Sequence, residues 1–169
     1  MFKSILGRLF WTYAIILMLV FTSVAVTVGI FVNHFAISTH MNNVISVSQN
    51  LEYWTGSLQI EDTDYRARAA YKQLLRSWGS FLNSDIIVTN SNGEVLESTT
   101  SSATVPDELV HIVTNGNIIK KYSTLNGSYK NKMMVIGVPI KYQGGIVGAS
   151  FYVTGIFDIR KTTLELFMM

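Results

Sequence analysis

The chain has 169 residues, a formal net charge of +2 at pH 7 and a charged fraction of only 14%. This length leaves room for one ordinary domain plus an anchor, and so small a charge argues against nucleic acid as a partner. The chain contains no cysteine, which excludes disulfides, thiolate nucleophiles and iron–sulfur clusters.

The first predicted element is a membrane-spanning helix. Residues 9–32 contain no charged side chain, and a helix of that length measures about 36 Å against a hydrocarbon core of about 30 Å. Lys3 and Arg8 come before it and predict that residues 1–8 lie in the cytoplasm, because positive charges flank the cytoplasmic end of a span. A cleaved signal peptide is the alternative, since Ser23-Val24-Ala25 resembles a cleavage site. The apolar run continues well beyond it and favours the anchor.

Two helices are expected next. The first covers Asn33 to Leu58, continues the membrane span, and carries more apolar residues than one face of a monomer needs, so we expect it to form a homodimer. The second helix ends near Leu82. Its expected buried stripe consists of Tyr71, Leu74, Leu75, Trp78 and Leu82. Arg68, Lys72 and Arg76 recur every four residues on the other side, either as a solvated face or as a site for an anion.

Beyond Asn83 the apolar pattern becomes that of strands. Asp85–Asn90 and Glu94–Ser98 predict a hairpin, and a short helix follows over Pro106–Val113. Further strands are expected at 117–125, 132–142 and 146–154, followed by an exit helix over 155–169. The order predicts an α+β fold: an N-terminal transmembrane helix continuing into a long helix, a five-stranded antiparallel meander with helices on one face, and the exit helix.

Two short motifs in this region resemble a known family. Asp85–Asn90 followed by Asn92–Leu96, and Gly137–Ile140 followed by Ile146–Ala149, resemble the first hairpin and the last two core strands of extracytoplasmic PAS-like or Cache-like sensor domains. These domains occur in bacterial membrane receptors, especially sensor histidine kinases.

The resemblance implies a domain organisation. It assigns residues 33–161 to the sensor domain, outside the bacterial plasma membrane, and residues 162–169 to the start of a truncated second transmembrane helix. We therefore expect the chain to be the signal-input fragment of a longer two-component histidine kinase that passes a signal by helix displacement. The alternatives are the input domain of a chemotaxis receptor or diguanylate cyclase, or a self-contained membrane-anchored binding or accessory protein.

The resemblance also implies a ligand pocket between the sheet and the segment that follows the hairpin. The candidate ligand-binding residues, with one helical cation added, are Lys120, Tyr122, Met133, Val135, Phe151 and Arg76. Strand alternation places Lys120 with Tyr122, and Met133 with Val135, on common faces. The sequence leaves open which of these faces is turned inward.

No catalytic residues are identified in the chain. His34 and His40 lie about 120° apart on a helix and His111 stands alone, so no metal site is expected. There is no phosphoacceptor histidine motif and no glycine-rich nucleotide-binding sequence. We expect no cofactor. The expected partners are the lipid bilayer, a second copy of the chain, and a small-molecule or protein ligand outside the membrane.

Overall fold

The computed structural model describes residues 5–60, 65–101 and 104–155. The chain divides into two compact units, Met1–Ile37 and Ser38–Met169. The expected exit helix beyond Gly155 and the expected start of a second membrane span at 162–169 lie outside the described residues.

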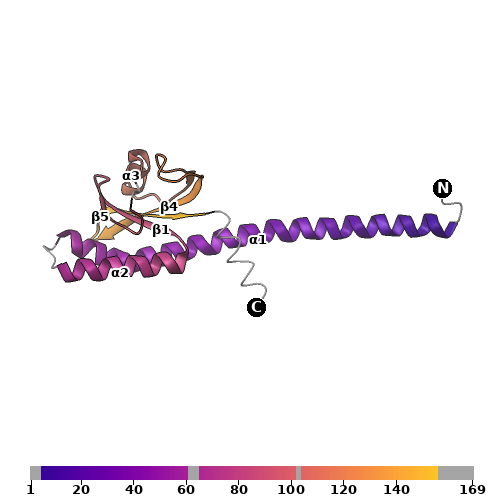
Figure 1. Ribbon diagram of the computed structural model, residues 1–169, viewed down its shortest axis with the longest axis horizontal. Helices are drawn as coiled ribbons and strands as arrows, with labels where there is room; N and C mark the ends of the chain where they lie inside the picture. Colours follow the sequence, from indigo (N-terminus) through magenta and orange to yellow (C-terminus); the bar gives the residue numbers. More distant parts are fainter. Residues whose placement is uncertain (1–4, 61–64, 102–103, 156–169) are drawn as a thin grey trace. The chain divides into compact units, whose positions relative to one another are not determined.

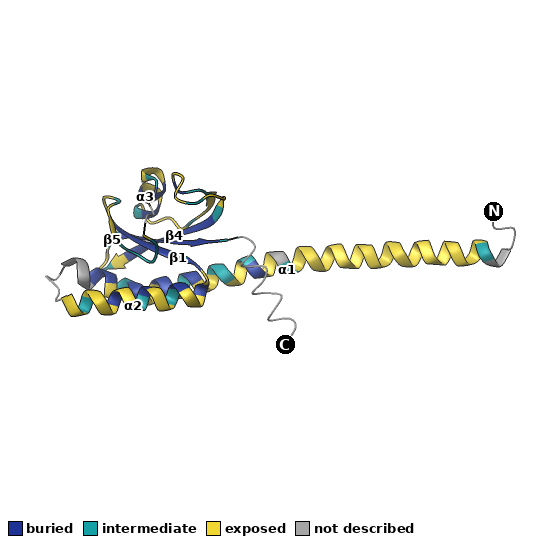
Figure 2. Ribbon diagram, in the orientation of Figure 1, coloured by how far each residue is buried: buried dark blue, intermediate teal, exposed yellow. Residues whose placement is uncertain are grey.

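The first unit is built by the beginning of α1 (Ile5–Ile60). Figure 2 shows this part of α1 as exposed along almost its whole length. Most of the exposed side chains are apolar, and Phe10, Leu19 and Phe31 are each about two-thirds exposed. Within the described residues α1 is the one helix long and apolar enough to cross a membrane. Since so large an apolar surface is unfavourable in water, a lipid environment suits it. Residues 9–31 of the predicted span are exposed, and Val32 is half-buried.

The second unit contains an antiparallel sheet in the order β2-β1-β5-β4-β3. Its strands are β1 (Asp85–Asn90), β2 (Val95–Ser98), β3 (Ile119–Ser123), β4 (Met133–Tyr142) and β5 (Gly145–Thr154). Each strand lies within two residues of its predicted bounds. The expectation of a meander is wrong, because β5 lies between β1 and β4. The connection between β2 and β3 carries α3 (Asp107–Thr114) and leads to the far edge of the sheet.

One face of the sheet is covered by α2 (Tyr65–Leu82) and by the part of α1 in the second unit (Figure 1). The Ser48 hydroxyl of α1 lies 3.2 Å from the Ser150 hydroxyl of β5, and both residues are fully buried. The Thr55 and Tyr71 hydroxyls join the two helices at 2.6 Å. Of the predicted stripe on α2, Tyr71, Leu75 and Leu82 are buried, while Leu74 and Trp78 are half-buried.

The other face of the sheet packs against α3. Helices were expected on one face, and this holds for α1 and α2, whereas α3 lies on the opposite side (Figure 1). The apolar cluster there comprises Ile87, Val105, Leu109, Val110, Val113, Leu125, Val135, Ala149, Phe151 and Val153. Burying such side chains contributes about 1.5–3 kcal/mol each. The sheet is therefore sandwiched between two apolar layers.

Glycine and asparagine set the tight turns of the sheet. The turn between β4 and β5 places Gln143 at φ 50° and Gly144 at φ 84°, as a two-residue type I′ hairpin requires. In the first hairpin the Asn90 side-chain oxygen accepts hydrogen bonds from the backbone N–H groups of Asn92 and Glu94, at 3.0 and 2.9 Å. The small polar residues after β1 thus form the turn.

Candidate functional site

The candidate site is built on the exposed side of α2. Burial of Tyr71, Leu75 and Leu82 fixes the rotation of this helix about its axis. The same rotation turns Lys72 and Arg76, one helical turn apart, toward the solvent. Lys72 and Arg76 are therefore surface groups beside the sheet, and Arg68 is an exposed group on the same helix.

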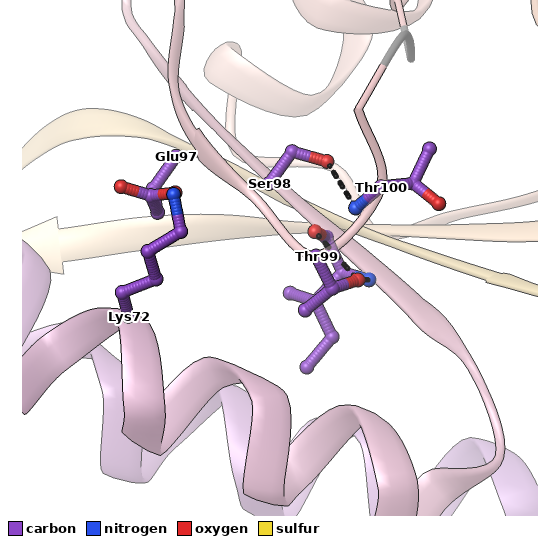
Figure 3. Close-up of polar contacts among 6 residues, drawn as sticks. Lys72, Glu97, Ser98, Thr99 and Thr100 are labelled. Carbon is purple, nitrogen blue, oxygen red and sulfur yellow. Dashed lines mark hydrogen bonds and ion pairs between the residues drawn. The ribbon is translucent and has the colours of Figure 1, made fainter.

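Strand β2 faces Lys72 across a groove. The Lys72 ammonium lies 2.9 Å from a carboxylate oxygen of Glu97, and Figure 3 shows the two side chains pointing toward each other. Both side chains are partly exposed, at 46% and 24%, so the ion pair contributes at most about 1 kcal/mol. The main consequence of the ion pair is electrostatic, because the carboxylate of Glu97 neutralises the charge of Lys72 locally.

Thr99 closes the end of the β1–β2 ladder. Its hydroxyl oxygen accepts a hydrogen bond from the Ile86 backbone N–H at 2.9 Å, and its own N–H donates to the Ile86 carbonyl at 3.0 Å. Next to it, the Thr100 N–H donates to the Ser98 hydroxyl at 3.1 Å (Figure 3). These bonds hold the hydroxyl-rich segment after β2 beside α2.

Two cavities open on this part of the domain. The first has a volume of about 530 Å³ and lies where β1 begins and β5 ends. It is lined by Arg76, Gly79, Ser80, Asn83, Ser84, Asp85, Thr99, Met133, Val153, Thr154 and Gly155. The second, of about 660 Å³, lies between α2 and β2 and is lined by Lys72, Arg76, Thr104 and residues 95–101. Arg76 and Thr99 belong to both walls.

Arg76 is the uncompensated charge at this junction. It forms no ion pair or hydrogen bond with any other residue in the part of the chain that the structure describes. Asp85 in the wall of the first cavity has a different partner, because it accepts a hydrogen bond from the Tyr129 hydroxyl at 2.7 Å. Burial, and next the bond to Asp85, raise the pKa of Tyr129 well above its usual range. Tyr129 therefore stays a neutral donor.

The six predicted ligand-binding residues fall into three groups. Arg76 and Met133 line the first cavity. Val135 and Phe151 are fully buried in the apolar cluster under α3. Lys120 and Tyr122 are exposed and lie on the opposite face of the sheet from Val135, since they pair with Ile136 and Met134. The structure thus brings together two of the six at a cavity.

Asp85 was not among the predicted site residues. The sequence does offer a signal for Asp85, because it is a carboxylate at the first position of an apolar strand. A strand that starts beside the end of a helix often begins at the protein surface. The remaining wall residues, such as Asn83 and Thr154, carry no such signal. Among the described residues no group of three His, Asp or Glu side chains could hold a metal ion.

Comparison with known proteins supports the fold. No protein-family model matches the sequence, and no curated protein resembles it in sequence. Among solved structures, the sensor domain of the histidine kinase DctB from Vibrio cholerae has a TM-score of 0.57 at 8% identity, covering 78% of this chain and 54% of that one. The expected resemblance to PAS-like or Cache-like sensor domains is confirmed at the level of fold.

Two chemoreceptor domains are weaker matches. The Campylobacter jejuni Tlp3 ligand-binding domain with L-norvaline has a TM-score of 0.45 at 14% identity, covering 76% of this chain and 59% of that one. The Pseudomonas aeruginosa PctC domain with GABA has a TM-score of 0.46 at 12% identity, covering 76% and 62%. The chain spans little more than half the length of each of these sensor domains.

Proposed function

We propose that the chain is the signal-input module of a bacterial membrane receptor, with a cytoplasmic N-terminus and an extracytoplasmic sensor domain over residues 33–161. The output we propose is a two-component histidine kinase. The observation that carries the proposal is the continuity of α1, which is a single helix from Ile5 to Ile60. Its first part is apolar and exposed, and its later residues, such as Leu51, are buried in the domain.

This continuity supports transmission by helix displacement. A ligand shifts a conformational equilibrium only by binding one state better than another. The first cavity is lined by Val153, Thr154 and Gly155 at the end of β5, and also by α2. The Thr154 hydroxyl donates to the Asn83 carbonyl at 2.9 Å, which ties the end of β5 to the α2–β1 connection. A ligand there would contact both α2 and the end of β5.

Cysteine labelling tests the proposed topology. The natural chain has no cysteine, so single substitutions give a clean signal. Ser91→Cys lies in the exposed turn after β1, and we expect a membrane-impermeant maleimide to label it in intact cells. Ser4→Cys, before the apolar stretch, should be labelled only after lysis. Labelling of Ser91→Cys only after lysis would contradict an extracytoplasmic sensor.

The proposed homodimer is tested in the same background. Asn43, Ser46 and Asn50 are exposed on α1 at helical spacing, so cysteines there should form disulfide-linked dimers in membranes if α1 meets its copy. Ser77 on α2 is also exposed and serves as the control position. Equal cross-linking at all four positions would indicate random collision and would contradict a dimer along α1.

The output is decided by the gene beyond the codon for Met169. A second apolar span followed by a dimerisation helix bearing a phosphoacceptor histidine would support the kinase. A chemotaxis signalling module or a diguanylate cyclase module there would show a different output behind the same sensor. A stop codon would favour the self-contained accessory protein.

A further inference from the structure

Three Asn-Gly pairs occur in the chain, at Asn92-Gly93, Asn115-Gly116 and Asn126-Gly127. Asparagine is one of the residues that degrade chemically in proteins. It reacts most readily before glycine, because the glycine nitrogen attacks the side-chain amide carbon and glycine has no Cβ atom to crowd the approach. The attack requires the peptide plane between the two residues to rotate. The contacts that hold this plane therefore decide which pair reacts first.

The first two pairs are held in place. The Gly93 N–H donates a hydrogen bond to the Asn90 carbonyl at 3.1 Å. The Gly116 N–H donates to the Val113 carbonyl at 2.8 Å. A Cβ atom built on either glycine would already contact an apolar side chain, at 3.5 Å on Gly93 and 3.6 Å on Gly116. Rotation of either peptide plane would break a hydrogen bond and press the glycine against its neighbour.

The third pair lacks both restraints. The backbone groups of Asn126 and Gly127 and the side chain of Asn126 form no hydrogen bond with the part of the chain that the structure describes. No atom outside the immediate chain neighbours would lie within 4 Å of a Cβ atom built on Gly127. Both residues are exposed, with φ angles of 55° and 84°. Rotation of this peptide plane breaks no hydrogen bond of its own and meets open space.

We propose that Asn126 is a site of spontaneous deamidation. Hydroxide removes the N–H proton of Gly127, and the nitrogen forms a bond to Cγ of Asn126. The bond between Cγ and the side-chain nitrogen breaks, and that nitrogen takes up a proton from water and leaves as ammonia. Water then opens the five-membered ring, at Cγ to give aspartate or at the backbone carbonyl carbon to give isoaspartate. Either product adds one negative charge, and the reaction consumes no oxidant or reductant.

Isoaspartate would change the turn more than aspartate, because it inserts one carbon atom into the backbone. Two hydrogen bonds span the reacting pair, from the Ser128 N–H to the Leu125 carbonyl and from the Tyr129 N–H to the Thr124 carbonyl, each at 3.0 Å. Tyr129 also donates its hydroxyl to Asp85 in the wall of the first cavity. We therefore expect isoaspartate to loosen the connection between β3 and β4.

Mass spectrometry of the full chain in detergent micelles tests the proposal. Each deamidation adds one mass unit, and electron-transfer fragmentation distinguishes isoaspartate from aspartate. Asn92 and Asn115 in the same molecules are the matched controls. At pH 8.5 and 37 °C we expect Asn126 to react about 2- to 10-fold faster than either control, because no hydrogen bond of its glycine has to break. The rate should rise with pH, since hydroxide removes the proton.

Two further measurements separate folded geometry from sequence. In guanidinium chloride the three asparagines should react at similar rates, because the hydrogen bonds of the folded chain are absent. Asn126→Asp carries the added charge but keeps the backbone length. Amide hydrogen exchange in residues 124–132 should therefore be faster in aged protein that contains isoaspartate than in Asn126→Asp.

Equal rates at the three sites in the folded chain, or a faster rate at Asn92 or Asn115, would overturn the proposal. Reaction of Asn126 only in guanidinium chloride would show that the folded turn blocks the attack. Equal hydrogen exchange in the isoaspartate form and in Asn126→Asp would remove the effect on the connection between β3 and β4. These measurements need only the folded chain, so their failure would leave the proposed function standing.

Discussion

Gly137 in β4 tests whether the space between the sheet and α3 is a filled core or a ligand pocket. A Cβ atom at this position would lie 2.7 Å from Val113, 2.8 Å from Ile119 and 2.9 Å from Phe151. Favourable carbon–carbon contacts are about 3.5–4.0 Å long, so each contact would be about 1 Å too short. The three neighbours belong to α3, β3 and β5, and all of them would have to move.

The expected cost of Gly137→Ala follows from these contacts. Overpacking of a well-packed core costs about 1–3 kcal/mol. The reduced freedom of the unfolded chain offsets about 0.4–1 kcal/mol of this. The net loss should be about 1–2 kcal/mol in the free energy of unfolding. For a domain of this size that corresponds to a fall of about 3–8 °C in the unfolding temperature.

Thermal unfolding of the full chain in detergent micelles measures this fall. Gly145→Ala is the matched control, because it is also a strand glycine and the nearest atom to its Cβ would be the Tyr142 carbonyl oxygen at 3.9 Å. This variant should be as stable as the natural chain or slightly more stable. If Gly137→Ala were equally stable, the space under α3 would be open, and the reasoning that places Val135 and Phe151 in a closed core would be refuted.

Two further predictions concern pH. Burial raises the pKa of Tyr152 from 10.0 to about 12, so the stability that depends on a neutral Tyr152 is fully present below pH 10 and falls by about 1.4 kcal/mol per pH unit as the pH rises to 12. Tyr152→Phe should therefore make the free energy of unfolding in urea less sensitive to pH in that range. An unchanged dependence of this free energy on pH would contradict the prediction. Burial lowers the pKa of His40 from 6.5, and its Nε2 atom is buried without a hydrogen-bond partner among the described residues. The stability that depends on a neutral His40 is therefore present above pH 6.5 and falls on acidification. His40→Phe should reduce the loss of unfolding temperature between pH 7.5 and 5.5, whereas equal acid sensitivity would show that other groups dominate.

The strands could be predicted because their signals are local. The alternation in Asp85–Asn90 and the turn residues Asn90–Gly93 and Gln143–Gly145 depend only on neighbours in the chain, and each strand appears close to its predicted bounds. Hairpin partners follow from short turns. The pairing of β1 with β5 could not be predicted in this way, because more than fifty residues and a helix separate the two strands in the chain.

The candidate site was only partly predictable for the same reason. The four-residue spacing of Arg76 with Arg68 and Lys72 indicates a possible anion site, and the resemblance to sensor domains implies Met133 as a pocket residue. The same resemblance implies Lys120 and Tyr122 as pocket residues, but it does not specify the register of β3 against β4. That register places them with Ile136 and Met134, on the other face from Val135. A shift of one residue in pairing exchanges the two faces of a strand, and no local signal sets this register.

The sequence by itself determined the apolar helix, the α+β class and the approximate position of each strand, because these depend on composition and on the periods of helix and strand. Only the tertiary structure decided that β5 lies at the centre of the sheet and that α3 covers the face opposite α1 and α2. It also decided that Glu97 pairs with Lys72, while Arg76 has no partner among the residues that the structure describes. These features arise from contacts between residues distant in the chain. Their energies depend on geometry that no short segment specifies.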